Sequence, residues 1–117
     1  MPITNESSKL VTKASDLTGT GQVTLYTAPA NHTVIVRALI VNNSDSTARN
    51  ILVQLNDGST TTNIFEARAI AANSSEALIN DNAPLYLQAG NIVYVTATTA
   101  NTLLTTISVE EYYDPNR

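Results

Sequence analysis

The run from Thr33 to Asn42 is the longest β-rich stretch of the sequence, and it constrains the fold more than any other. A strand places alternate side chains on opposite faces. Apolar residues occupy all of the even positions and most of the odd ones, namely Val34, Val36, Ala38 and Ile40, and Ile35, Leu39 and Val41 beside Arg37. A strand that is apolar on both faces must be covered on both, which a single small sheet cannot provide. We therefore expect this run at the centre of a two-layer fold.

The second face of this run needs a cover of its own. We expect Ile35, Leu39 and Val41 to be covered either by the N-terminal segment or by a neighbouring subunit, because exposed apolar patches usually mark association. This surplus of apolar surface is the clearest functional signal that the residues themselves provide, and it indicates a building block of a larger assembly.

Short alternating segments separated by turn residues fill the rest of the chain. They predict seven or eight strands in all, at 22–27, 33–42, 49–56, 64–71, 76–79, 91–99 and 103–112, with 85–87 leading into a turn. Residues 9–17 fit either a helix or a strand, and we favour a strand because everything downstream is β. The predicted class is all-β, an antiparallel sandwich similar to a jelly roll. We assign 1–8 to an extended N-terminal arm, 9–113 to the sandwich domain and 114–117 to a C-terminal tail.

Composition excludes several classes of function. The chain has 117 residues, which suffices for one domain, and its net charge of −4 argues against binding to nucleic acid. It contains no cysteine, so neither a disulfide framework nor a thiolate metal site is possible. No signal peptide and no apolar run of about 20 residues is evident, so we expect synthesis in the cytoplasm and no contact with a membrane.

Residues that could carry catalysis are few. His32 is the only histidine, and it stands in a turn without a nucleophile or carboxylate at a telling spacing, so we interpret it as an exposed loop residue. Glu110 and Glu111 are adjacent, and neighbours in a strand point to opposite faces, so they cannot share one acid–base site. We predict no catalytic residue, and no enzymatic activity.

Ligand sites have equally weak signals. Three aspartates could bind calcium, Asp57, Asp81 and Asp114, but none lies in the dense acidic pattern of a dedicated loop, and turn formation explains them better. Four tyrosines could stack on sugar rings, Tyr86, Tyr94, Tyr112 and Tyr113, although packing at the core edge is the commoner role. We therefore expect no cofactor and no metal.

Two parts of the sequence resemble small virion proteins of tailed bacteriophages. Residues 25–36 read LYTAPANHTVIV and 41–44 read VNNS, which is similar to the segment LYTVPAGKTAVV…V.N.S of those proteins. Residues 85–93 read LYLQAGNIV and 107–111 read ISVEE, which is similar to their ending L.L.AGD.I.V…V.VSG.E. The resemblance covers about residues 9–112. It departs at two turns, where Asn31 and His32 replace Gly-Lys and Asn91 replaces Asp.

The resemblance implies a structural component of the virus particle. A cement or decoration protein is the first hypothesis: it would bridge subunits of the major capsid protein on the shell surface and associate with itself as a trimer or dimer. A tail, fibre or adhesion component, which could bind carbohydrate, is the alternative. Our expected contact residues are Ile3, Ile35, Arg37, Leu39, Val41, Asn43 and Ser44.

Overall fold

The computed structural model describes residues 8–115, and within them the chain forms nine β-strands and no helix. Strands β1 to β9 span Ser8–Leu17, Val23–Thr27, His32–Asn43, Arg49–Asn56, Thr61–Ile70, Ser74–Ile79, Leu85–Leu87, Ile92–Ala97 and Leu103–Tyr113. The segment that fits a helix or a strand is therefore a strand, β1, and the all-β prediction is confirmed. The short β7 is the strand that brings the number above the predicted seven or eight. This part of the chain contains no helix that could span a membrane.

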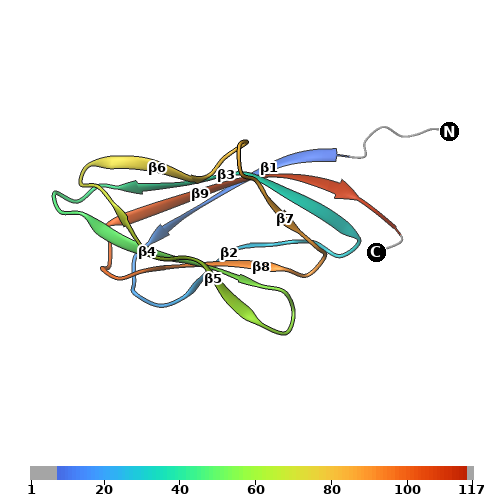
Figure 1. Cartoon of the computed structure of the whole chain (residues 1–117), viewed down its shortest axis with the longest axis horizontal. Coiled ribbons are helices and arrows are strands. Elements are labelled where there is room, and N and C mark those ends of the chain that lie inside the picture. The colour runs from blue at the N-terminus through green and yellow to red at the C-terminus, as the bar shows by residue number, and fades with distance from the viewer. Residues whose placement is uncertain (1–7, 116–117) are drawn as a thin grey trace.

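The strands form two antiparallel sheets that pack face to face (Figure 1). Sheet A has the order β1-β9-β3-β6, with β7 also paired to β3, and sheet B has the order β2-β8-β4-β5. The first four strands alternate between the two sheets, and the last strand lies beside the first. This is the arrangement of a jelly roll, a sandwich of two Greek keys. The predicted jelly-roll-like sandwich is confirmed.

A β-bulge divides the central strand, β3, into two halves. Arg37 is an extra residue between two ladder pairs of β3 with β9, so the side-chain alternation shifts by one position there. Even-numbered residues face the interior before the bulge and odd-numbered residues after it. The fully buried apolar residues of the strand are accordingly Val34, Val36, Leu39 and Val41.

The expectation that Ile35, Leu39 and Val41 share a second face in need of outside cover is therefore wrong. Leu39 and Val41 lie between the two sheets, where sheet B covers them. Ile40 takes the outward position beyond the bulge and is 40% exposed. A strict two-residue period cannot represent this arrangement, because the period itself breaks at Arg37.

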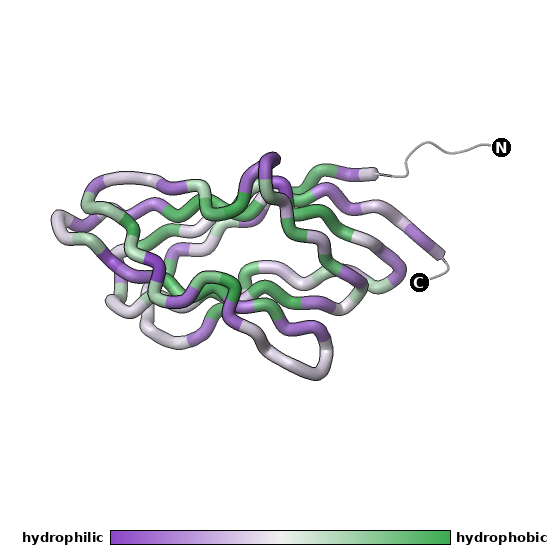
Figure 2. The backbone as a smooth tube through the Cα atoms, viewed as in Figure 1, coloured by the Kyte–Doolittle hydropathy of each residue, from purple (hydrophilic) through white to green (hydrophobic). Residues whose placement is uncertain are grey.

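The interior is filled by aliphatic side chains from both sheets. Figure 2 marks the hydrophobic residues of both layers as green stretches of the backbone. The largest fully buried side chains are Leu17, Leu39, Ile51, Ile70, Leu87, Leu103 and Ile107. Burying each such side chain stabilises the fold by about 1.5–3 kcal/mol. Among the described residues the only buried aromatic side chain is that of Tyr26.

Several tight turns depend on residues that tolerate positive φ. Asn31, Asn73 and Asn101 have φ values of 62°, 52° and 63°, and Gly58 and Gly90 have 102° and 85°. Asparagine and glycine are the residues that adopt this left-handed conformation most readily. Asn31 can therefore adopt the left-handed conformation that the turn before β3 requires.

Tyr26 of β2 links the two sheets. Its hydroxyl donates a hydrogen bond to a carboxylate oxygen of Glu111 on β9, at 2.5 Å, and its ring lies 5.9 Å from the Lys13 ammonium on β1. The residue is only 2% exposed, and burial raises the pKa of its hydroxyl far above the ordinary value, with the Glu111 bond adding to the effect. The hydroxyl therefore stays protonated and bonded in the folded chain.

We predict that alkaline pH destabilises the protein in part through Tyr26. The folded chain keeps a proton on this hydroxyl, whereas the unfolded chain loses it above about pH 10. The stabilisation that comes from the raised pKa of Tyr26 is fully present below that pH. Above it, the free energy of unfolding falls by about 1.4 kcal/mol per pH unit. Urea unfolding between about pH 10 and 11.5 should show a shallower decline for Tyr26→Phe than for the wild type.

The matched control is Tyr86→Phe, because the Tyr86 side chain is 62% exposed in the folded chain. This control should decline as steeply as the wild type. Identical slopes for Tyr26→Phe and the wild type would contradict the role assigned to Tyr26.

Candidate interaction surface

One face of the sandwich carries most of the exposed apolar side chains. We call the face of sheet A that points away from sheet B the outer face of sheet A. Five large apolar side chains of the described residues are exposed, and four of them lie on this face: Leu10 (77%), Ile40 (40%), Tyr86 (62%) and Leu104 (41%). Strand register confirms the grouping, because one ladder row crosses Leu10, Glu110, Ile35 and Tyr86 in that order.

An ion pair lies in the middle of this face. The Arg37 guanidinium donates to one carboxylate oxygen of Glu110 from Nε at 3.1 Å and from Nη2 at 2.6 Å, and Asp81 lies 3.9 Å away. The Arg37 bond, together with one from the Tyr112 hydroxyl, holds the pKa of Glu110 below its usual value. The carboxylate is therefore charged at neutral pH, and it fixes the guanidinium among apolar neighbours.

This combination of residues suits contact with another protein. Tyrosine and arginine are enriched in the cores of protein interfaces, and contiguous apolar surface usually marks a binding site. The described residues enclose no pocket and no group of three potential metal ligands. The surface can therefore bind a broad partner, whereas it offers no cavity for a small molecule.

The predicted contact residues divide into three groups. Ile35 and Arg37 lie on the outer face of sheet A, as expected, and Ser44 is exposed in the loop after β3. The interior holds Leu39, Val41 and Asn43, each 0% exposed, so these three side chains cannot touch a partner directly. Ile3 lies outside the described residues.

Sequence reasoning missed Leu10, Ile40, Tyr86 and Leu104 as members of this face. The alternation within β1 does place Leu10 on the same face as Ser8, Thr12 and Asp16, and this mostly polar face is the signal of an outward position. What the sequence could not supply was the register that brings β1, β9, β3 and β7 into common rows. That register joins segments far apart in the chain.

Asn43 anchors the loops at one end of the sandwich. Its side-chain amide donates to the carbonyl oxygens of Thr47 and Ile70 at 3.0 Å and of Ala71 at 3.3 Å, and its oxygen accepts from the backbone N–H of Asp45 at 2.9 Å. One buried side chain therefore ties the loop after β3 to the end of β5. The Asn43 amide can be buried because hydrogen bonds within the protein replace the ones that it would make with water.

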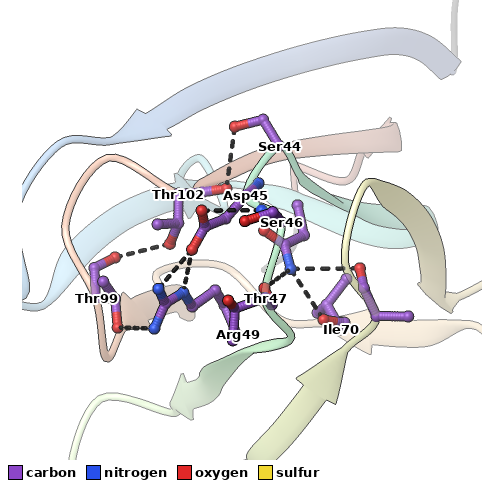
Figure 3. A network of polar contacts seen from close by, with 10 residues as sticks. Ser44, Asp45, Ser46, Thr47, Arg49, Ile70, Thr99 and Thr102 are labelled. Atoms are coloured by element: carbon purple, nitrogen blue, oxygen red, sulfur yellow. Dashed lines mark hydrogen bonds and ion pairs between the residues drawn. The ribbon is translucent and has the colours of Figure 1, made fainter.

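Around it, an ion pair extends the same network (Figure 3). The Arg49 guanidinium donates to Asp45 at 2.5 Å and to the Thr99 hydroxyl at 3.4 Å, and the Ser44 backbone N–H donates to the Thr102 carbonyl at 3.1 Å. The Arg49 bond is the main cause that lowers the pKa of Asp45. Loops from three connections are thus held together at this end.

The residues considered for catalysis lie apart. His32 begins β3, half-buried, with Nδ1 2.8 Å from the Ala30 carbonyl oxygen and its ring 5.5 Å from that of Tyr113. Glu110 binds Arg37 on the outer face, whereas Glu111 accepts the Tyr26 bond on the opposite face. The prediction that the two glutamates cannot share a site is confirmed.

The residues considered for ligands do not gather either. The Asp57 carboxylate accepts backbone N–H groups of Ser59 and Thr60 at 3.1 and 2.9 Å, which lowers its pKa and confirms its role in a turn. The four tyrosines are dispersed: Tyr86 and Tyr112 lie on the outer face of sheet A, Tyr94 on the far face of sheet B, and Tyr113 against His32.

We predict that Asn43→Ala lowers the free energy of unfolding by about 2–3 kcal/mol, because it removes the buried bond to the Ile70 carbonyl together with the bonds to Thr47 and Asp45. Asn42→Ala is the matched control: Asn42 is the neighbour that bonds the exposed Ser75 hydroxyl, and its loss should change stability by no more than about 0.5 kcal/mol. Urea unfolding of both variants measures the difference. Equal effects would contradict the anchoring role of Asn43.

Two solved structures share this fold over nearly their whole length, although no family model matches the sequence and no curated protein is detectably similar to it. A chain of the acidic stable capsid of Helicobacter pylori bacteriophage KHP30 has a TM-score of 0.54 and 13% identity, with 96% of this chain and 91% of that chain covered. A chain of the cyanophage Pam1 capsid asymmetric unit has a TM-score of 0.53 and 18% identity, with 97% and 91% covered. The jelly roll described above is thus similar to a fold found in phage capsids.

Proposed function

We propose that this protein is a structural component of a bacteriophage virion, and that it acts as a cement or decoration protein on the surface of the capsid shell. One observation carries the proposal: the fold matches capsid chains of two phages over more than nine-tenths of each chain. The partner would be the major capsid protein, and the protein would have no catalytic role.

The outer face of sheet A is the surface that would meet the shell. It presents the exposed apolar residues Ile40, Tyr86 and Leu104 and, elsewhere on the same face, the Arg37–Glu110 ion pair. Burying each exposed apolar side chain against a partner contributes free energy in proportion to the area removed from water. The contact residues retained from the sequence are Ile35, Arg37 and Ser44, and Ile3 remains a proposed contact in the arm.

Stabilisation of a shell would follow from linkage. A protein that binds the assembled shell, and not its dissociated subunits, shifts the equilibrium toward assembly. Many copies need only modest affinity each, because every copy that bridges two subunits raises the effective concentration of one subunit beside the other. The contact surface of each copy can therefore be small and the many copies together still stabilise the shell.

The copy number in purified particles tests the proposal. We predict a number comparable with that of the major capsid protein, measured by quantitative mass spectrometry of virions with that protein as the reference. A handful of copies would contradict a shell role and favour the tail or adhesion component, and complete absence would contradict a virion role.

A pair of tyrosine variants tests the assigned face. We predict that Tyr86→Ala weakens binding to purified shells by about tenfold, because Tyr86 is 62% exposed on this face and an aromatic side chain that a partner buries is a typical hot spot. Tyr113→Ala is the matched control, since Tyr113 is 57% exposed but belongs to the opposite face of β9. Equal loss in both variants, or none in Tyr86→Ala, would contradict docking through the outer face of sheet A.

A further inference from the structure

A sandwich of two sheets has four edges, and open edges are sites where another strand can add. Unpaired backbone N–H and C=O groups along an edge bind a further strand unless the edge is protected. Among the described residues, the edges of sheet A are β1 on one side and β6 with β7 on the other, and those of sheet B are β2 and β5.

Three of these edges carry the features that block strand addition. β5 has two register irregularities, and Ala67 within it has φ = 52°, so this edge is kinked. The edge of β6 and β7 consists of two short strands, Ser74–Ile79 and Leu85–Leu87, that are separated by a turn. β2 has five residues and a register shift between Thr24 and Tyr26.

β1 lacks all of these features. It has ten residues, and each of them pairs with β9 in one unbroken antiparallel register from Ser8 to Leu17. It contains neither proline nor a bulge, and its charged side chains, Lys9, Lys13 and Asp16, limit the registers that an added strand can take. Leu10 lies on the outward face near the beginning of the strand, and at 77% it is the most exposed large apolar residue of the described chain. A long straight edge with an uncovered leucine is suited to strand addition.

We infer that β1 pairs antiparallel with β1 of a second copy of this chain, about a two-fold axis at Thr12, so that the two sheets A become one continuous sheet. A second copy is an economical partner, because two-fold pairing uses the same surface on both subunits. The inference concerns the isolated protein and stands independently of the proposed role on a capsid.

The charges of β1 select this register. With the axis at Thr12, each charged residue of one copy faces an uncharged residue of the other copy. The pairs across the axis are Lys9 with Ser15, Lys13 with Val11, and Asp16 with Ser8. An axis at Val11 would set Lys9 opposite Lys13, and an axis at Lys13 would set that lysine opposite itself, which is unfavourable. Axes at Leu10 or Ala14 leave a shorter overlap.

Parallel pairing fails for the same reason as the rejected antiparallel registers. In-register parallel strands would place Lys9, Lys13 and Asp16 against their own copies. A slip by a single residue would turn the outward face of one copy toward the inward face of the other. The antiparallel register about Thr12 is thus the longest one without a like-charge pair directly opposite.

The side-chain sizes also match in this register. Leu10 lies opposite Ala14 on the outward face, twice by symmetry, so a large exposed side chain meets a small one. Thr12 lies opposite Thr12, a pair that stabilises antiparallel strands. The dimer would therefore cover the most exposed leucine of each copy while it satisfies both open edges.

Analytical ultracentrifugation of the purified chain tests the inference. We expect a dimer at micromolar concentration, and Ala14→Lys should raise the dimer dissociation constant by about tenfold or more, because the symmetry repeats the disruption. Ala77→Lys is the matched control, since Ala77 is an exposed alanine of β6 at the other edge of the sheet. A monomeric wild type, or equal dissociation of both variants, would overturn the inference.

Single cysteines test the register directly, because the chain has none of its own. Under mild oxidation Thr12→Cys should give a disulfide-linked dimer, since directly opposite Cα atoms of antiparallel strands lie about 4.5–5.5 Å apart, within the range that a disulfide spans, whereas Ser75→Cys at the far edge should not. A chain lacking residues 1–7 should still dimerise. Loss of the dimer on that deletion would show that the N-terminal segment of a neighbour, rather than β1, makes the contact and would overturn the inference.

Discussion

The bulge at Arg37 is the constraint on which the rest of the structure depends. Without it, β3 would continue its alternation and turn Leu39 and Val41 toward solvent instead of into the interior. The shift also turns Ala38 and Ile40 outward, so the net gain is the difference between the two pairs, about two buried methylene groups or roughly 1.6 kcal/mol. The bulge interrupts the ladder at the cost of about one hydrogen bond, which is worth about 0.5–1.5 kcal/mol of net stabilisation. The difference favours a strand that breaks its own period over one that keeps it.

The same shift determines which way the side chains point at the bulge and at the end of β3. It places Asn43 inward, where the amide meets the carbonyl groups of Thr47 and Ile70 and fixes the loops beyond the strand. It also leaves Arg37 on the outward side, where the guanidinium reaches Glu110 of β9. One extra residue thus decides which side chains stabilise the interior and which remain available to a partner. Core and interaction surface are consequences of a single backbone irregularity.

The sequence predicts what depends on local pattern and fails where remote pairing decides. Alternation and turn residues correctly indicated an all-β jelly roll, and β1 as a strand, because each strand must present a consistent apolar face. The contact residues were only partly accessible: Ile35 and Arg37 precede or occupy the bulge and keep their expected positions, whereas Leu39, Val41 and Asn43 follow it and are reversed. Tyr86 joined the surface only through the pairing of β7 with β3.

Sheet twist connects the two proposed associations. In a dimer through β1, the path from one β3 to the other runs β3-β9-β1-β1-β9-β3, which contains five strand-to-strand steps. At about 20–25° per step, the two β3 strands differ in direction by roughly 100–125°. The outer faces near Leu10 would then share one direction, while the faces near Tyr86 would diverge. Such a dimer cannot lie flat on one surface, and it suits a junction where two differently inclined subunits meet. A bridging role would follow from the geometry of a twisted sheet.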